Sequence, residues 1–173
     1  MRTIAVYTLG CKVNQYDTEA MLELFERAGY ASVPFDSEAD IYLINTCTVT
    51  GTGDQKSLKT VRRVARLHPD CAIIVCGCLA QRLADEILKM DNVRLVLGVT
   101  KRGRVVELIE RALNENTRIN AVETLKNAPF EKLAVSRHEG KTRATMKIQE
   151  GCDRWCTYCI IPAVRGPVRS MPL

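Results

Sequence analysis

The sequence predicts an α/β fold, in which helices flank an open parallel sheet. Short, continuously apolar runs alternate with longer amphipathic ones through the first 115 residues, and this alternation is typical of βαβ units. Helix-stop residues separate the runs, at Ala28-Gly29-Tyr30 and at His68-Pro69. Together these observations favour a doubly wound, flavodoxin-like domain over residues 1–115.

Each element of this domain follows from its residue pattern. Four apolar runs are predicted strands: Thr3–Gly10, Ile41–Thr46, Ala72–Gly77 and Val93–Gly98. Four amphipathic stretches are predicted helices: Tyr16–Ala28, Asp54–Leu67, Ala80–Lys89 and Arg102–Leu113. We expect Asn14 to cap the first helix, Asp17 to add negative charge to its first turn, and Thr100 to cap the fourth.

The periodic pattern ends after residue 115. Residues 116–142 are mostly polar and charged, which predicts a connector with room for an edge strand. Ala144–Gln149 then has the pattern of a new strand that leads directly into a cysteine-rich loop. We therefore predict a first domain at 1–115, a connector at 116–142 and the start of another domain at 143–173.

Composition excludes several classes of protein. The chain of 173 residues is 46% hydrophobic and 26% charged, which is typical of globular domains. Its longest apolar run, Cys71–Ala80, has about half the roughly 20 residues that a membrane-spanning helix needs, so we expect no membrane association. Eight cysteines without a secretory signal indicate a reducing compartment, and we expect a cytoplasmic protein.

Three cysteines, Cys152, Cys156 and Cys159, lie within the loop EGCDRWCTYCIIP. Structural zinc takes four ligands, usually as two separated pairs, so this spacing suits zinc poorly. It also differs from the ferredoxin run, which has four cysteines. Three thiolates suit a 4Fe-4S cluster with one iron left open to a ligand. A zinc knuckle or a loop of reactive thiols is the alternative.

Three further cysteines, Cys11, Cys47 and Cys78, each follow a predicted strand directly. Ligands of an open parallel sheet bind beyond the carboxyl ends of its strands, so we predict that these thiols converge on one edge as a second three-cysteine site. Cys71 and Cys76 fit better as small buried hydrophobic residues. The sequence leaves open whether Cys76 replaces or assists Cys78.

The loop Gly151–Gly166, GCDRWCTYCIIPAVRG, resembles the signature of radical S-adenosylmethionine enzymes. The resemblance implies that Cys152, Cys156 and Cys159 hold a 4Fe-4S cluster whose free iron binds S-adenosylmethionine. It also implies that Tyr158 packs against cofactor and cluster. Reductive cleavage of that cofactor yields a 5'-deoxyadenosyl radical in this superfamily, with electrons from a partner such as flavodoxin or ferredoxin.

The motifs TLGCKVNQYDTE and NTCTVT resemble the amino-terminal domain of methylthiotransferases within that superfamily. The resemblance implies an auxiliary 4Fe-4S cluster on Cys11, Cys47 and Cys78 that supplies or carries sulfur. TLGCKVNQ is most similar to the subgroup that modifies threonylcarbamoyladenosine next to the anticodon of tRNA. We expect a monomeric transferase that binds the anticodon stem-loop.

That family continues through a TIM-like barrel into a small RNA-binding domain. A barrel takes roughly 200 residues or more, so we interpret residues 143–173 as the first strand and cluster loop of a truncated TIM-like radical S-adenosylmethionine barrel. We therefore expect an amino-terminal fragment that is inactive alone. Net charge is +5. Four basic residues follow one face of the second predicted helix, Lys56, Lys59, Arg63 and Arg66, and Arg62 is adjacent to them. They form either a phosphate-binding stripe or an ordinary solvated face.

Three alternative functions stay open on the sequence. One is a methylthiotransferase that acts on isopentenyladenosine in tRNA or on a ribosomal protein. Another is an iron-sulfur electron-transfer or cluster-carrier module without a substrate of its own. The last is a zinc-stabilised nucleic-acid-binding domain. Asn14 and Asn45, beside the second cysteine trio, suit hydrogen bonds to cluster sulfurs and capping of turns equally well.

Overall fold

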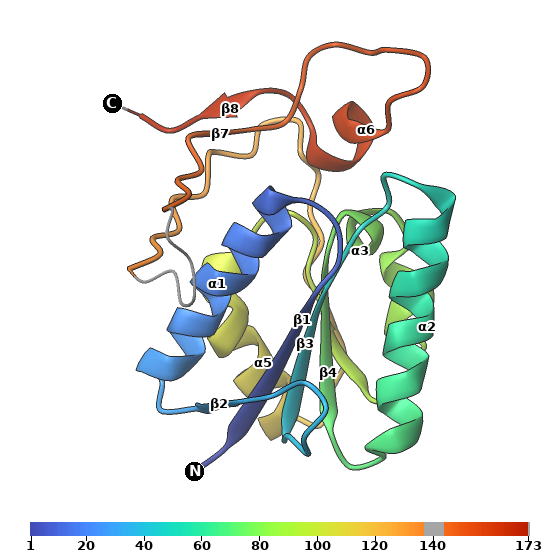
Figure 1. The fold of residues 1–173 in the computed structure, drawn as a ribbon, viewed down its shortest axis with the longest axis vertical. Helices are drawn as coiled ribbons and strands as arrows, with labels where there is room; N and C mark the ends of the chain where they lie inside the picture. The colour runs from blue at the N-terminus through green and yellow to red at the C-terminus, as the bar shows by residue number, and fades with distance from the viewer. Residues whose placement is uncertain (137–143, 173) are drawn as a thin grey trace.

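A six-stranded parallel sheet forms the centre of the computed structural model, which describes residues 1–136 and 144–172 (Figure 1). Its strand order is β2-β1-β3-β4-β5-β6, and every neighbouring pair is parallel. The strands are β1 (Thr3–Thr8), β2 (Ala31–Val33), β3 (Ile41–Thr46), β4 (Ala72–Gly77), β5 (Val93–Val96) and β6 (Ile119–Asn120). The predicted α/β fold class is confirmed, and the four predicted strands correspond to β1, β3, β4 and β5.

Helices cover both faces of the sheet, as the doubly wound prediction requires (Figure 1). They are α1 (Lys12–Arg27), α2 (Gly51–Leu67), α3 (Cys78–Arg82), α4 (Ala84–Leu88) and α5 (Val105–Asn114). On one face, Phe25 of α1 and Ile109 of α5 pack against strand residues such as Leu43. On the other, Val61 of α2 and Ile87 of α4 pack against the opposite side of the same strands. Each such fully buried side chain contributes about 1.5–3 kcal/mol of transfer free energy.

The helix starts differ from the sequence predictions. Helix α1 begins at Lys12 with Cys11 at its N-cap, so Asn14 lies inside the helix and caps nothing. Asp17 falls beyond the first turn and is buried. Helix α5 begins only after a 3₁₀ turn, η1 (Arg102–Arg104), so Thr100 is not its cap. The predictions for Asn14, Asp17 and Thr100 are wrong because polar side chains that make tertiary contacts resemble capping residues in sequence.

The third predicted helix is divided. Two short helices, α3 and α4, take its place, and Leu83 separates them with a non-helical backbone (φ -120°, ψ 34°). The two edge strands of the sheet, β2 and β6, are short. Strand β6 lies within the predicted connector 116–142 and is the edge strand expected there.

The carboxyl-terminal segment lies across the carboxyl ends of the sheet strands (Figure 1). It contains β7 (Gln149–Glu150), α6 (Ile161–Arg165) and β8 (Arg169–Ser170). The predicted strand Ala144–Gln149 is wrong in extent, because only its last residue is paired, in an antiparallel ladder with β8. A barrel strand needs parallel neighbours, and the part of the chain described here offers β7 none. The barrel stays a prediction.

Candidate metal centre

The turns that carry Cys11, Cys47 and Cys78 meet at one edge of the sheet. Cys11 precedes α1 and is exposed, Cys47 follows β3 and is half-buried, and Cys78 opens α3 and is buried. The β1 turn touches Cys47, since a Cβ on Gly10 would lie 2.9 Å from the Cys47 Cβ and 3.0 Å from its Sγ. The parallel topology therefore gathers cysteines that are scattered along the sequence.

Glycine precedes two of these cysteines for a steric reason. Gly10 and Gly77 have φ of +105° and +95°, a region that other residues rarely adopt. A Cβ on Gly77 would lie 2.4 Å from Asn45 Oδ1 and 2.5 Å from the Thr46 carbonyl oxygen. The chain can thus turn sharply from β1 into Cys11 and from β4 into Cys78. Cys47, Asn45 and Thr46 stay in close contact with these turns.

Asn14 and Thr46 tie the three turns together. The Asn14 Nδ2 donates to the Leu9 carbonyl at 2.8 Å and to the Thr46 carbonyl at 3.0 Å. The Thr46 hydroxyl donates to the Cys76 carbonyl at 2.5 Å and accepts from the Ala80 amide at 3.3 Å. Asn14 thereby joins the turns before Cys11 and Cys47, and Thr46 joins β3 to the turn around Cys78.

Two further side chains support the same turns. The Ser57 hydroxyl accepts from the Cys47 amide at 3.3 Å and donates to the Gly53 carbonyl at 2.8 Å. The Asn45 Nδ2 donates to the Asn14 carbonyl at 2.9 Å. Its Oδ1 is buried without a hydrogen-bond partner among the residues that the structure describes. Asn14 and Asn45 therefore hold the backbone around the cysteines in place through hydrogen bonds, and neither of them caps a helix.

The remaining cysteines of the sheet domain are core residues in this structure. Cys76 is fully buried on the face covered by α1 and α5, and burial raises its pKa strongly. Burial likewise raises the pKa of Cys71 to about 11. High thiol pKa values disfavour the thiolate that binds metals. Burial also raises the pKa of Cys78, but the Arg165 guanidinium opposes that rise through its charge and as a hydrogen-bond donor.

The second trio lies in the irregular loop before α6. The Cys152 amide donates to the Gly166 carbonyl at 3.0 Å, and the Cys159 amide donates to the Cys156 carbonyl at 3.0 Å. These bonds close the base of the loop and a turn within it. Cys156 is exposed and the other two thiols are partly buried. Tyr158 is 90% exposed, so its predicted packing against a cofactor stays a prediction.

Helix α6 brings the two cysteine regions close together (Figure 1). It packs on α3 through a small apolar cluster that contains Cys78, Val99, Leu125 and Val164, with Ile160 at its edge. Ile160 directly follows Cys159, and α3 begins with Cys78. The loop of the second trio therefore sits against the helix that carries part of the first.

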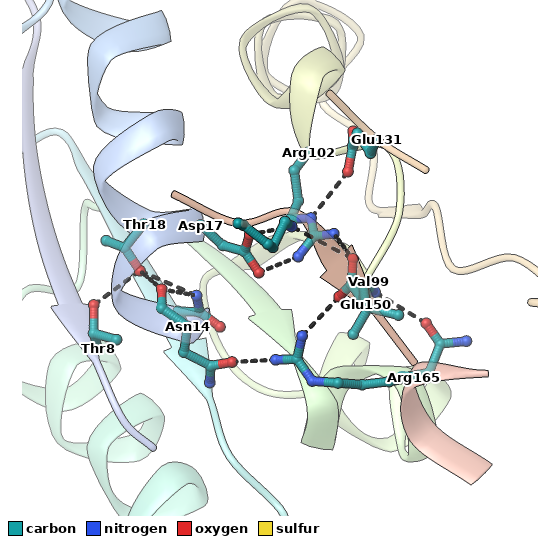
Figure 2. Close-up of polar contacts among 12 residues, drawn as sticks. Thr8, Asn14, Asp17, Thr18, Val99, Arg102, Glu131, Glu150 and Arg165 are labelled. Carbon is teal, nitrogen blue, oxygen red and sulfur yellow. Dashed lines mark hydrogen bonds and ion pairs between the residues drawn. The ribbon is translucent and has the colours of Figure 1, made fainter. Parts of the chain in front are cut away.

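A buried ion cluster joins the carboxyl-terminal segment to the sheet domain (Figure 2). Its members are Asp17, Arg102, Glu131, Lys147, Glu150, Arg165 and Arg169. Arg102 pairs with Asp17 and lies 2.9 Å from Glu150 Oε2. The Lys147 Nζ lies 2.6 Å from Asp17 Oδ1. Burial disfavours ionisation of Glu150, but the cations around it, Arg102 first, hold its pKa at about 2.

This ion cluster was not predicted from the sequence. Its members come from five separate stretches of the chain, and only the tertiary fold brings them together. One signal was available, because the signature loop ends in Arg165-Gly166, a basic residue within an otherwise apolar stretch. Figure 2 shows the Arg165 side chain reaching both Asn14 and Glu150.

The donor set and backbone of the first trio fit an iron-sulfur cluster. Three free thiols stand at these turns, and in two of the turns, before Cys11 and Cys78, a glycine leaves no room for a Cβ. Among residues 1–136 and 144–172, no three His, Cys, Asp or Glu side chains are close enough to hold a single metal ion. Thiolates of a cluster bind different irons and therefore stand further apart than the ligands of one ion.

The comparison with protein families decides the relationship. Residues 3–98 match the family described as Uncharacterized protein family UPF0004. The chain belongs to this family. The match spans the sheet from β1 to the end of β5, and it includes all three cysteine turns of the first trio.

Relatives of this UPF0004 member include three kinds of methylthiotransferase. It is 47% identical to threonylcarbamoyladenosine tRNA methylthiotransferase MtaB of Bacillus subtilis, over 98% of this chain and 38% of the relative. It is 39% identical to ribosomal protein uS12 methylthiotransferase RimO of Desulforudis audaxviator, over 96% and 38%. It is 35% identical to tRNA-2-methylthio-N(6)-dimethylallyladenosine synthase of Staphylococcus epidermidis, over 98% and 34%. The chain thus spans less than two-fifths of each relative's length.

No helix within the described residues is long and apolar enough to cross a membrane. The five basic residues of α2 are all exposed, and one of them, Arg63, lies 3.5 Å from Asp36 Oδ1. Their contact with phosphate stays a prediction.

Proposed function

We propose that this chain is part of a methylthiotransferase that modifies threonylcarbamoyladenosine next to the anticodon of tRNA. The observation that carries the proposal is the gathering of three cysteine turns, held by Asn14 and Thr46, at the carboxyl edge of the sheet. The 47% identity to a relative named for that substrate supports the choice of base. We place the protein in the cytoplasm as a monomer.

Each trio has a distinct role in this proposal. Cys11, Cys47 and Cys78 would hold an auxiliary 4Fe-4S cluster, and Cys152, Cys156 and Cys159 would hold the cluster that binds S-adenosylmethionine. When bound, these groups would supply the radical chemistry and the sulfur that an unactivated adenine carbon requires.

The chain's own residues position these groups. Asn14, Thr46 and Ser57 fix the backbone of the first trio. Packing of α6 on α3 keeps the loop of the second trio beside Cys78. Tyr158, whose ring is 90% exposed, would cover a cofactor bound at that loop.

Anaerobic reconstitution of the full-length protein tests the cluster assignment. We expect two 4Fe-4S clusters by iron and sulfide counting, and an EPR spectrum that changes when S-adenosylmethionine is added. Cys78→Ala should lose the auxiliary cluster, and Cys156→Ala should lose the response to S-adenosylmethionine. Cys76→Ala is the matched control and should keep both clusters. Stoichiometric zinc in place of iron would contradict the assignment.

Nucleoside analysis tests the substrate. The full-length enzyme, with flavodoxin or ferredoxin as reductant, is supplied with tRNA bearing threonylcarbamoyladenosine, tRNA bearing isopentenyladenosine, or ribosomal protein uS12. We expect methylthio addition to the first substrate alone. Modification of another substrate would move the assignment to the subgroup of RimO or of the dimethylallyladenosine synthase, to which the chain is 39% and 35% identical.

The other class of function is an iron-sulfur electron-transfer or cluster-carrier module. It differs in one measurable respect, because its clusters would be indifferent to S-adenosylmethionine. An EPR spectrum of the full-length protein that is unchanged by this cofactor, with both clusters present, would favour that function over a transferase.

A further inference from the structure

A pocket of about 680 Å³ lies beside the carboxyl end of β5, and none of the residues that line it is a cysteine. We call it the β5 pocket. Its walls are mostly apolar and come from the turn after β5, from η1 and from the connector. The residues that line it include Thr100, Lys101, Arg104, Lys126, Ala128 and Pro129. Its volume lies within the range of small-molecule sites, roughly 300–1,000 Å³.

The Thr100 hydroxyl is a buried polar group of this pocket that lacks a partner. Thr100 is 7% exposed, and its Oγ1 has no hydrogen-bond partner among the residues that the structure describes. Nearly all buried hydroxyls in proteins are hydrogen-bonded, because burying one without a partner is costly. Thr100 does not cap α5. Its hydroxyl is therefore free to hydrogen-bond a ligand of the pocket.

The charges around the β5 pocket leave one cation for an anionic ligand. The Lys101 Nζ lies 2.6 Å from Glu123 Oε1, and Glu131 Oε2 lies 2.9 Å from Arg102 Nε. Lys126 is exposed and has no ion-pair partner within residues 1–136 and 144–172. The pocket therefore favours a ligand that brings a negative charge to Lys126.

A fixed guanidinium plane is the third feature of the β5 pocket. The Arg104 Nε donates to Glu107 Oε2 at 2.9 Å, and its Nη2 donates to Glu107 Oε1 at 2.6 Å. Two hydrogen bonds to one carboxylate hold the plane of the guanidinium, while the side chain stays 52% exposed. Guanidinium planes stack on nucleobases, and proteins recognise bases of single-stranded RNA in this way. The pocket thus combines a platform for a base with a cation for its phosphate.

We propose that the β5 pocket binds one nucleotide of an RNA strand. The base stacks on Arg104 beside Pro129, and the Thr100 hydroxyl hydrogen-bonds the base or its ribose. Lys126 neutralises the phosphate. That the strand is tRNA rests on the proposed function.

The position of the β5 pocket suits this role. Ligands of open parallel sheets bind beyond the carboxyl ends of the strands, and the pocket lies at the edge of the sheet that also carries the cysteine turns. Val99, which precedes Thr100, shares a small apolar cluster with Cys78. A nucleotide in the pocket therefore holds the RNA strand on the same side of the domain as the first trio.

RNA binding by the full-length protein tests the site separately from the chemistry. The probe is a fluorescein-labelled anticodon stem-loop of tRNA, and its dissociation constant is measured by fluorescence anisotropy at several salt concentrations. Lys126→Gln removes the phosphate contact, Thr100→Val removes the hydroxyl at similar volume, and Arg104→Lys keeps the charge but loses the plane. Lys89→Gln is the matched control, because Lys89 is an exposed lysine between α4 and β5, at the opposite edge of the sheet.

We expect Lys126→Gln to weaken binding about tenfold and to reduce the slope of log affinity against log salt concentration by about one, since one phosphate contact is lost. Thr100→Val and Arg104→Lys should weaken binding roughly three- to tenfold without changing that slope, because neither alters the charge. Lys89→Gln should change neither quantity. Wild-type affinity and slope in Lys126→Gln would overturn the proposal, as would an equal change in Lys89→Gln. Because Lys126 is exposed, its replacement leaves the fold intact, and the test stands even where Thr100→Val does not fold.

Ultraviolet crosslinking of the labelled RNA, followed by peptide mapping, locates the contact. Crosslinks in the peptide that contains residues 123–131 would support the site, and crosslinks confined to other peptides would contradict it. Methylthio addition to tRNA by an enzyme whose RNA affinity is the same in all three pocket variants would overturn this inference alone. Pocket-dependent RNA binding without any methylthio addition would instead overturn the proposed function and leave the site in place.

Discussion

Replacement of Glu150 with glutamine should weaken docking of the carboxyl-terminal segment on the sheet domain. Glu150 lies within 2.9 Å of Arg102 and 2.6 Å of Arg165, and its side chain is 2% exposed. Removing one partner from a buried ion pair costs about 3–5 kcal/mol, because the remaining charge is left uncompensated. Since each 1.4 kcal/mol is a factor of ten, the segment should open roughly 10²- to 4 × 10³-fold more often.

Hydrogen exchange followed by mass spectrometry measures this opening. Amides of residues 147–170 should lose protection in Glu150→Gln, whereas those of β4, at the centre of the sheet, should keep it. Glu107→Gln serves as the matched control, because it breaks an exposed pair between Glu107 of α5 and Arg104 of η1 and should change neither region. Equal protection of residues 147–170 in the wild type and Glu150→Gln would refute the assignment of docking to the ion cluster.

Three further predictions concern single positions. Gly77→Ala should lower the unfolding midpoint in urea more than Gly29→Ala. Both glycines have positive φ, but only at Gly77 would a Cβ lie within 3.0 Å of neighbouring atoms. Equal decreases of the urea midpoint in the two variants would contradict this. Because the pKa of Glu150 lies at about 2 rather than 4.5, its stabilisation should be complete above about pH 4.5 and disappear as pH falls towards about 2. Urea titrations should show that loss in the wild type and a flatter profile in Glu150→Gln. Iodoacetamide should alkylate the exposed Cys11 of the apoprotein long before the buried Cys76, as peptide mapping would reveal.

The sheet was predictable because its signals are local. Each central strand is a short apolar run, and β3 and β4 are buried along their whole length, so periodicity finds them without tertiary information. The edge strand β2 has three residues and none of them is buried. Such a strand has no hydrophobic signature and exists because β1 offers an unpaired edge. Its position could not be read from the sequence.

The cysteine site was predictable in outline for a topological reason. Parallel strands all end at one edge, so residues that follow them meet there whatever their separation in sequence. The residues that organise the site were less accessible. Asn14 and Asp17 have the composition of a helix start, and their actual partners, Thr46 and Arg102, lie 32 and 85 residues away in the chain. Long-range hydrogen bonds of this kind leave no local periodicity.

Buried ion pairs, and not apolar contacts alone, join the carboxyl-terminal segment to the sheet domain. This affects how strictly the alignment of the two parts is fixed. The apolar cluster between α3 and α6 is small, and contacts of that kind tolerate sliding, since dispersion and burial are not directional. A buried arginine fork loses a partner whenever it shifts. Buried ion pairs add little net stability relative to apolar side chains but strongly penalise a wrong alignment. The ion cluster therefore favours one alignment of α6 on α3, and with it one alignment of the two loops that carry the cysteine trios.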